Sequence, residues 1–326
     1  MSVLVTGAAG FIGSHTAVRL LQRGDQVIGL DNLNDYYPPE RKRSNLREVE
    51  REARSAGQFE FIEGDVRDRA LLERVFRQHD VRAVIHLAAM AGVRVSVEDP
   101  WLYYDVNLTG TLNLLEAVRA QSTRATFVLA STSSVYGGTA ALPFTETDSA
   151  DRPLAPYAAS KRAAEMLGFT YHHLHGLDFT ALRFFTVYGP RGRPDMMAYK
   201  VLDSAYGADP VPYYNGGQMH RDWTFVDDIV SGIVAASDRR LGYELINLGR
   251  GEPVLLADFV ATLERLAGRK PHLVERPMLD ADVKYTYADI GKARRLLDYD
   301  PQVNVEEGTR RFFEWYVAHA KPSGQE

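Results

Sequence analysis

The stretch Val3-Leu4-Val5-Thr6-Gly7-Ala8-Ala9-Gly10-Phe11-Ile12-Gly13 decides the fold of this chain. Its short apolar run predicts a buried β-strand, and the glycine pattern that follows predicts a turn into a helix. In such a turn Gly7 permits the tight bend, Gly10 lets the backbone approach a pyrophosphate, and Gly13 allows close packing of the helix. The helix N-terminus then offers free N–H donors to phosphate. The stretch therefore predicts a dinucleotide-binding turn.

A second apolar run, Gln26 to Asp31, ends on a carboxylate that is the expected acceptor for both hydroxyls of a cofactor ribose. An acid at this position repels a 2′-phosphate, and its neighbours Asn32 and Leu33 carry no positive charge. We therefore expect NAD rather than NADP. Beside Gly7, Gly10, Gly13 and Asp31, the expected cofactor contacts are Phe11, Ile12, Asp65, Val66, Leu87, Ala88 and Ala89.

Short β-rich runs alternate with helical runs over the first half of the chain, which predicts βαβ units and a doubly wound parallel sheet in an α/β fold. Several strands are continuously apolar, as expected where helices cover both faces of a sheet. The polar stretch between Asp31 and Phe59 predicts an inserted loop with a short helix. The expected strands are Val3–Thr6, Gln26–Asp31, Phe59–Glu63, Ala83–Leu87 and Thr126–Ala130, and the expected helices are Phe11–Gln22, Ala70–Arg77 and Val106–Ala120.

The second half of the chain has a different texture. Residues 187–225 are rich in Gly, Pro, Tyr and Arg, whereas Trp223–Ala236 and Tyr243–Leu248 again look like a helix and a strand of the main sheet. We therefore expect residues 1–186 to form the NAD-binding domain, with residues 225–250 returning to it. Residues 187–224 and 251–326 are expected to form a smaller, discontinuous C-terminal lobe that binds the substrate.

Composition and charge limit the function. The 326 residues can bury a core large enough for two lobes. The net charge of −5 and the pI near 6.0 give no electrostatic reason to expect nucleic acid as a partner. The basic cluster within Glu40–Arg47 is followed closely by acids. We interpret it as a solvated helical face rather than a rim that steers phosphate.

The chain has no cysteine, which excludes disulfides, thiolate catalysis and thiolate-ligated metals. His172, His173 and His175 cluster without carboxylates at ligand spacing, so we expect an exposed helix face and no metal. The N-terminus lacks the pattern of a signal peptide, and no apolar stretch is long enough to cross a bilayer. We therefore expect no membrane partner and a cytoplasmic location.

A second motif, Tyr157-Ala158-Ala159-Ser160-Lys161, places a phenol and an ammonium one helical turn apart. A phenol with an ordinary pKa of about 10 is a poor base at neutral pH. A nearby ammonium and a positively charged nicotinamide ring lower that pKa, so the phenolate can take a proton from an alcohol. Upstream, a strand runs into a hydroxyl-rich loop with Thr132, Ser133 and Ser134, which can share this proton. The two motifs together indicate a redox enzyme that uses a nucleotide cofactor.

These motifs, with Asp65-Val66 and Leu182-Arg183-Phe184-Phe185, resemble the extended short-chain dehydrogenase/reductase superfamily in its nucleotide-sugar epimerase branch. The match covers nearly the whole chain. The resemblance implies a Rossmann-like fold whose C-terminal lobe binds a UDP-sugar. It implies that Tyr157 is the general base, that Lys161 lowers its pKa and holds the nicotinamide ribose, and that Thr132 lies near the 4-oxygen of the sugar. NAD would stay bound and be regenerated in each turnover.

Residues 31–37 and 186–196 are similar to the corresponding segments of UDP-glucuronate 4-epimerases. The resemblance implies that Arg193 and Thr186 meet the sugar carboxylate, and a guanidinium does bind carboxylate in a bidentate manner. Arg191 competes for this role. The implied UDP contacts are Tyr214 on uracil, Arg221 and Arg276 on the diphosphate, and Asp282 on the uridine ribose, with Asp280 as a competitor because the segment departs from the commoner Pro-Gly-Asp arrangement.

Four alternatives share parts of this pattern. UDP-glucuronate decarboxylases resemble Ser-Thr-Ser-Glu-Val-Tyr-Gly at the hydroxyl loop, whereas this chain has Ser134 in place of the Glu. Sugar 4,6-dehydratases need an Asp-Glu pair where Ser133-Ser134 stand. A UDP-glucose or UDP-galactose epimerase leaves Arg193 without a charged partner. The fourth hypothesis, from a different functional class, is a non-catalytic NAD-binding regulator, because a fold does not fix a function.

The resemblance also implies a homodimer. In relatives the helices corresponding to Pro100–Ala120 and Tyr157–Leu174 pair across a two-fold axis. We therefore expect this chain to pair with a second copy through the same helices.

Overall fold

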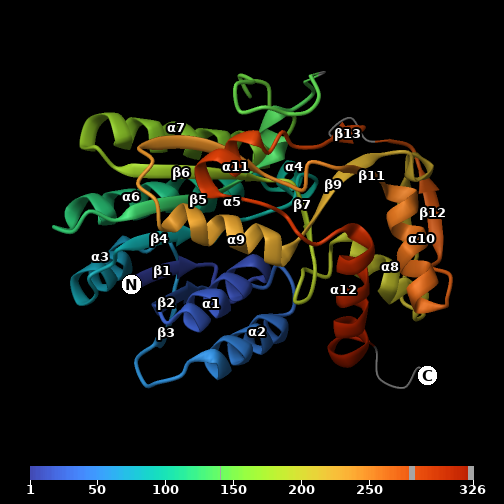
Figure 1. Cartoon of the computed structure of the whole chain (residues 1–326), viewed down its shortest axis with the longest axis horizontal. Helices are drawn as coiled ribbons and strands as arrows, with labels where there is room; N and C mark the ends of the chain where they lie inside the picture. Colours follow the sequence, from blue (N-terminus) through green and yellow to red (C-terminus); the bar gives the residue numbers. More distant parts are fainter. Residues whose placement is uncertain (140, 279–282, 322–326) are drawn as a thin grey trace.

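The centre of the computed structural model, which describes residues 1–139, 141–278 and 283–321, is a seven-stranded parallel sheet (Figure 1). The strand order is β10-β6-β5-β4-β1-β2-β3, and its part from β3 to β6 has the 3-2-1-4-5-6 order of a doubly wound dinucleotide-binding sheet. This confirms the predicted α/β fold. The strands are β1 (Ser2–Thr6), β2 (Gln26–Asp31), β3 (Phe59–Glu63), β4 (Ala83–His86), β5 (Thr126–Thr132), β6 (Asp178–Phe184) and β10 (Tyr243–Leu248).

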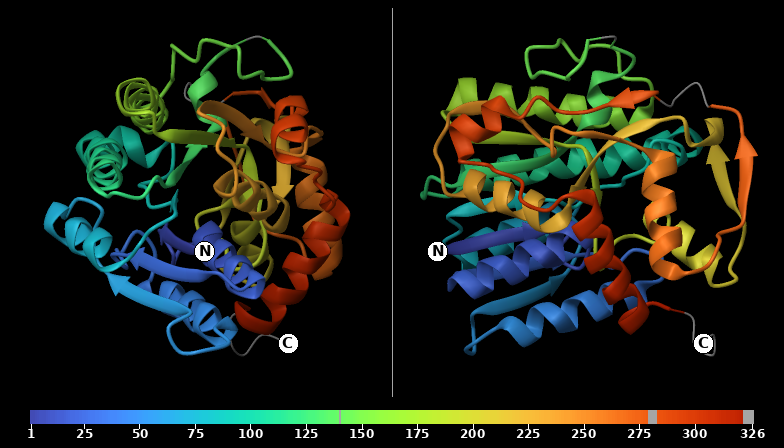
Figure 2. Two further views of the ribbon diagram at one scale, coloured as in Figure 1. Left: turned by 60° about the vertical axis from the view of Figure 1, so that its left-hand side comes forward. Right: turned by 45° about the vertical axis from the view of Figure 1, so that its right-hand side comes forward.

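Helices cover both faces of this sheet, as Figure 2 shows in its left view. On one face α1 (Phe11–Arg23) contacts α2 (Pro39–Glu52) and α9 (Val226–Ser237). On the other face α6 (Gly110–Ala120) lies between α3 (Arg69–Gln78) and α7 (Pro156–His175). Strands β4 and β5 are buried along their whole length, which explains the apolar runs Ala83–Ile85 and Phe127–Ala130 within them.

The stretch between β2 and β3 differs from the prediction. It holds the fourteen-residue helix α2, not a loop with a short helix. Lys42, Asn45, Leu46 and Val49 recur at helical spacing and are all buried. The pattern was hidden in the sequence because two of these four residues are polar. The interpretation of this region as a solvated face is therefore wrong for Lys42.

A second lobe follows β6 (Figure 1). One sheet joins β7 (Thr186–Tyr188), β9 (His220–Phe225), β11 (Pro253–Leu255) and β13 (Tyr285–Thr286), and a parallel pair joins β8 (Val211–Tyr214) to β12 (Leu273–Arg276). Helices α8 (Met197–Ala205), α10 (Leu256–Ala267) and α12 (Val305–His319) pack in this lobe. The chain returns to the main sheet at α9 and β10, and again at α11 (Gly291–Leu297), which contacts both. The two parts are therefore interleaved along the chain.

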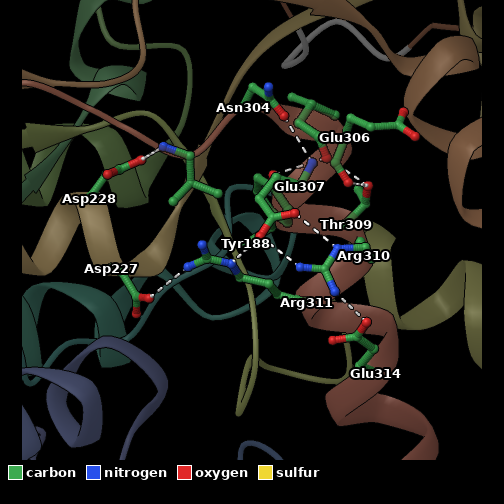
Figure 3. Close-up of polar contacts among 12 residues, drawn as sticks. Tyr188, Asp227, Asp228, Asn304, Glu306, Glu307, Thr309, Arg310, Arg311 and Glu314 are labelled. Carbon is green, nitrogen blue, oxygen red and sulfur yellow. Dashed lines mark hydrogen bonds and ion pairs between the residues drawn. The ribbon is translucent and has the colours of Figure 1, made fainter.

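The start of α12 is fastened to the start of α9 (Figure 3). The carboxylate of Asp228 accepts hydrogen bonds from the backbone N–H groups of Gln302, at 2.9 Å, and Val303, at 3.1 Å. Beside them, Arg311 lies 3.9 Å from the carboxylate of Asp227. These contacts hold the second lobe against a helix that packs on the main sheet.

The connections at the carboxyl end of the sheet carry the functional loops. Between β4 and β5 the chain forms α4 (Val95–Glu98), α5 (Pro100–Tyr104) and the π-helical turn η1 (Asp105–Thr109) before α6. The 3-10 turn η2 (Ser133–Tyr136) follows β5, and another, η3 (Asn215–Gly217), follows β8. None of the helices in the described ranges has both the length and the apolarity to cross a membrane.

Candidate active site

The glycine turn after β1 leaves no room for side chains. Gly7 has a φ of +70°, and a Cβ on it would lie 2.8 Å from the backbone nitrogen of Ala88. A Cβ on Gly13 would lie 1.9 Å from the carbonyl oxygen of Gly7. Helix α1 begins after Gly10, which provides no side-chain cap, so the first N–H groups of the helix remain available. This geometry fits the pyrophosphate of a dinucleotide.

A cavity opens at the carboxyl ends of β1, β4 and β5. It brings together the predicted cofactor residues and the predicted catalytic pair from separate segments of the chain. The predicted residues that line it are Gly7, Gly10, Phe11, Ile12, Gly13, Asp31, Asp65, Val66, Leu87, Ala88, Ala89, Thr132, Tyr157, Lys161 and Arg193.

Asp31 is buried at the end of β2, where its carboxylate accepts the backbone N–H groups of Ala9 and Leu33 at 3.1 and 2.9 Å. Burial raises the pKa of this carboxyl, and the ammonium of Lys42 opposes the rise. Lys42 lines the same cavity and donates to the backbone and side-chain oxygens of Asn34 at 2.8 and 2.6 Å. The prediction considered only Asn32 and Leu33 as neighbours of Asp31, so it did not include the positive charge of Lys42.

Helix α7 carries the phenol and the ammonium. Pro156 is its first residue, so Tyr157 lies in the first turn and Lys161 one turn later. Lys161 is only 2% exposed, and burial lowers its pKa to about 8, opposed by the carboxylate of Glu165. Thr132, the last residue of β5, lines the same cavity as Tyr157 and acts on the pKa of its phenol. The three side chains therefore meet at one wall of the cavity.

The pKa of Tyr157 does not shift as the sequence suggested. Burial raises the pKa of the phenol, while the Thr132 hydroxyl and the charge of Arg193 act against this rise. The protein's own residues thus leave the phenol weaker as an acid than in water. The prediction attributed a lowering to the Lys161 ammonium together with the oxidised nicotinamide ring, but Lys161 is not among the groups that shift this pKa. The positive charge of the nicotinamide ring is therefore the remaining source of the expected lowering.

Ser133 and Ser134 face a second cavity, which is also lined by Thr186 and Arg221. The backbone N–H of Ser134 donates to the Thr132 hydroxyl at 3.1 Å, and the two hydroxyls lie 3.2 Å apart. The hydroxyl loop therefore forms the wall between the cavities. Thr132 faces one cavity, and the two serines face the other.

The two candidate arginines point to different places. Arg193 lines the first cavity and binds Asp195 in a bidentate manner, with both nitrogen–oxygen distances at 2.9 Å. Arg191 has a φ of +59°, and its Nε lies 3.2 Å from Nε2 of His15, outside the described lining of either cavity. Burial lowers the pKa of Arg191 to about 10. Thr186 lies in the second cavity, so the structure does not bring it and Arg193 into one lining.

The remaining predicted substrate residues lie in the second lobe. Tyr214 packs under the guanidinium of Arg94, which is 4.0 Å from the ring centre. Arg276 stands beside Tyr214 in the β8–β12 pair and is exposed. Neither residue belongs to the described lining of the two cavities. Asp282 and its competitor Asp280 lie outside the described residues.

Sequence reasoning missed several residues that line the first cavity. They come from the connections after β2 and β4 and from the crossing into the second lobe. Some belong to segments 31–37 and 186–196, which carried the resemblance, but none was given a role in the site. These residues are Asn34, Tyr36, Tyr37, Lys42, Met90, Val106 and Met196. The parts of the chain that the structure describes hold no group of three metal-ligating side chains.

Fold and site together define a dinucleotide-dependent enzyme of the extended short-chain dehydrogenase/reductase type. The chain belongs to the family described as GDP-mannose 4,6 dehydratase, whose model matches residues 4–312. The resemblance to the nucleotide-sugar branch is thereby confirmed.

Among individual proteins, the chain is 46% identical to UDP-glucuronate 4-epimerase of Thermodesulfobacterium geofontis, over 96% of this chain and 95% of that protein. The structure is similar to the Bacillus cereus UDP-glucuronic acid 4-epimerase in complex with UDP-glucuronic acid and NAD, with a TM-score of 0.89, 34% identity and coverage of 98% and 99% of the two chains. It is also similar to the UDP-glucose 4-epimerase of Thermotoga maritima with UDP-glucose, with a TM-score of 0.87, 31% identity and coverage of 98% and 99%.

Proposed function

We propose that this chain is an NAD-dependent UDP-glucuronate 4-epimerase that interconverts UDP-glucuronate and UDP-galacturonate. One observation carries the proposal: the guanidinium of Arg193 lines the same cavity as Tyr157, Lys161 and Thr132. A uronate brings a carboxylate to the reacting sugar, and an arginine fork matches that group in charge and shape. The names of the most similar relatives support the same substrate.

The proposed reaction begins at the 4-hydroxyl of the sugar. Tyr157 removes the hydroxyl proton while the C4–H bond breaks, which leaves a 4-keto sugar and a protonated phenol. NAD, when bound by the glycine turn and Asp31, supplies the two-electron oxidation of C4 and its later reduction. The Thr132 hydroxyl orients the reacting oxygen, and the Lys161 ammonium stabilises the phenolate.

Epimerisation then requires the keto sugar to present its opposite face to Tyr157. The ring turns about its diphosphate tether, so the UDP end has to be held more firmly than the sugar. Arg221, which lines the second cavity with Ser133 and Ser134, is placed to hold an anionic group beyond the hydroxyl loop. In the proposed reaction Tyr157 returns its proton after the turn.

The 4-keto uronate is a β-keto acid, which loses carbon dioxide most readily when its C5–C6 bond stands perpendicular to the carbonyl plane. We assign to Arg193 the task of holding the carboxylate so that this bond stays nearer the plane. The decarboxylase pattern has a glutamate in the hydroxyl loop, whereas this chain has Ser134 at that position.

Product analysis after incubation with UDP-glucuronate tests the proposal. UDP-galacturonate is the expected product. A UDP-pentose would favour the decarboxylase, and turnover of UDP-glucose alone would favour the neutral-sugar epimerase, the activity named for the Thermotoga maritima neighbour. No turnover of any nucleotide sugar with NAD bound would favour the regulator.

The closed redox cycle implies that NAD stays with the enzyme between turnovers. We expect NAD in the supernatant of purified, denatured protein, at close to one equivalent per chain. A strong preference for NADP in binding measurements would contradict the role of Asp31.

The proposed enzyme is a homodimer paired through α5, α6 and α7, which lie on one flank of the molecule (Figure 2). Large apolar side chains on these helices face outward, with Trp101 at 85%, Phe169 at 53% and Leu174 at 64% exposure. Covering such side chains with a second copy stabilises the assembly. The mass in solution at micromolar concentration tests this, and a monomeric mass would contradict it.

Two further assignments stay predictions. One is the division into an NAD-binding domain, residues 1–186 with 225–250, and a UDP-sugar-binding lobe, residues 187–224 and 251–326. Separate calorimetric responses to NAD and to UDP would test it. The other is the cytoplasmic location, which cell fractionation would test.

A further inference from the structure

Behind the hydroxyl loop, the carboxylate of Glu165 is completely buried between two strands and its own helix. Its Oε1 accepts the hydroxyl of Ser131 at 2.6 Å and Nε of Arg183 at 3.0 Å. Its Oε2 accepts Nη2 of Arg183 at 2.8 Å and Nη1 of Arg162 at 3.0 Å. A buried carboxylate is stable only with such partners, so this group fixes the positions of everything it binds.

The segments that Glu165 joins are those that carry the catalytic side chains. Ser131 directly precedes Thr132 at the end of β5, and Lys161 lies one turn before Glu165 on α7. Arg183 lies on β6 with its guanidinium 4.7 Å from the ring centre of Tyr136, which belongs to the turn after the hydroxyl loop. One carboxylate therefore links the hydroxyl loop to the helix of the base.

The charge of Glu165 also acts on the ammonium of Lys161. Burial lowers the pKa of Lys161 to about 8, and Glu165 is the group that opposes this effect. His86, on β4, adds no positive charge near neutral pH because burial lowers its pKa to about 3. The titratable and charged groups around Lys161 and Glu165 are Tyr157 and Arg162 on α7, His86 on β4, Tyr136 on η2, Arg183 on β6 and Tyr243 on β10.

We propose that Glu165 is a positioning residue of the reaction, which holds Thr132 against Tyr157 through Ser131 and keeps Lys161 in its ammonium form. The proposal rests on the proposed epimerase function, because the task it serves is proton transfer by Tyr157. Glu165 itself lies behind the described lining of both cavities.

The test replaces the charge without changing the size. In Glu165→Gln we expect the alkaline limb of the kcat–pH profile to move down by about one pH unit, because Lys161 loses its neighbouring negative charge. We expect KM for UDP-glucuronate to change less than twofold. In Glu165→Asp the charge stays and the reach shortens, so the limb should stay in place while kcat falls severalfold.

A direct measurement separates this proposal from the proposed function. The chain has seven lysines, so carbon-13 labelling of lysine gives few signals, and Lys161→Arg assigns the one of interest. The Lys161 pKa should fall in Glu165→Gln whichever sugar the enzyme converts. An unchanged Lys161 pKa overturns the electrostatic role. Full recovery of kcat in Glu165→Asp overturns the positional role.

Arg162→Met provides a second variant if Glu165→Gln does not fold, because Arg162 is partly exposed and its loss leaves the buried Arg183 pair intact. Removing this cation leaves the Glu165 charge less compensated, so the Lys161 pKa should rise. The matched control is Glu244→Gln. Glu244 lies on the edge strand β10 and forms an ion pair with Lys292. A shift of the Lys161 pKa in the control as large as in Glu165→Gln would also overturn the proposal.

Discussion

Tyr157 is the residue on which the proposed chemistry depends most directly. Tyr157→Phe should retain the fold and bound NAD but lower kcat by roughly 100- to 10,000-fold, because the phenol is the general base. Tyr171→Phe, on the same helix, is a matched control, because the Tyr171 hydroxyl donates to Glu116 and Tyr171 does not line the cavity. Turnover and NAD content measured on both variants check this, and near-normal turnover in Tyr157→Phe would exclude it as the base.

Arg193 should select uronates over neutral sugars. Arg193→Ala should weaken binding of UDP-glucuronate by about 1.5 to 3 kcal/mol, the contribution of a hydrogen bond to a charged group, and leave UDP affinity nearly unchanged. We also expect a larger fraction of decarboxylated pentose among the products. Calorimetry and product chromatography measure the two effects. Unchanged uronate affinity with an unchanged product ratio would remove Arg193 from the mechanism.

Asp195 already occupies the fork of Arg193, so a substrate carboxylate has to compete with it. Asp195→Asn should relieve this competition and tighten UDP-glucuronate binding severalfold, while UDP-glucose binding stays constant. Asp209→Asn, an exposed aspartate in the second lobe, serves as the control for a simple change in net charge. Weaker uronate binding in Asp195→Asn would show that Asp195 orients the guanidinium rather than blocks it.

The residues that the sequence could place at the site were those in motifs with a fixed backbone geometry. The sequence placed Gly7, Asp31 and Lys161 at one cavity because a strand, a turn and a helix fix their relative positions. It did not place Lys42, because the tertiary fold brings α2 over that cavity. Nor could it separate Arg191 from Arg193, because a left-handed backbone at Arg191 turns the chain between them.

Among the elements, the segment that leads into α12 is held to α9 by the carboxylate of Asp228. Asp228→Ala leaves the backbone N–H groups of Gln302 and Val303 without their acceptor, so the free energy of unfolding should fall by about 1 to 3 kcal/mol. Asp227→Ala is the matched control, since its contacts to Arg311 and His15 are longer, at 3.9 and 3.8 Å. Urea unfolding of both variants measures the difference. Equal losses would show that the N–H groups find other acceptors.

Most strands of the main sheet followed from their apolar runs, because a strand buried on both faces needs apolar residues throughout. Strand β6 was not among the expected strands. Helix α2 did not, since Lys42 and Asn45 occupy buried positions that the pattern expects to be apolar. The Nδ2 of Asn45 donates to the carbonyl of Ala9 at 2.9 Å. Polar residues that serve a site therefore concealed the helix that carries them.

The stability of the whole molecule should depend on two histidines, the fully buried His86 and the half-buried His15. Burial lowers the pKa of His15 and of His86 to about 3, whereas an unfolded chain has a histidine pKa near 6.5. Below about pH 6.5 the unfolded state binds protons that the folded state does not, so stability falls as the pH falls toward 3. Each histidine contributes up to about 1.4 kcal/mol per pH unit in this window.

Melting temperatures measured from pH 8 to pH 5 check this. We expect His15→Gln to flatten the acid side of the profile, and we expect no effect from His173→Gln, whose side chain is exposed on α7. A profile for His15→Gln parallel to that of the unchanged chain would show that His15 takes up a proton without unfolding.

The interleaved path of the chain has a consequence for how the protein is made. During synthesis β6 is followed by β7 to β9, and the last strand of the main sheet, β10, is complete only at Leu248. A nascent chain that ends at residue 186 therefore exposes β6 as an open, apolar edge. Soluble yields of fragments 1–186 and 1–250 would reveal the difference. The main sheet cannot be completed before β7 to β9 of the second lobe have been synthesised, so the two parts have to fold together.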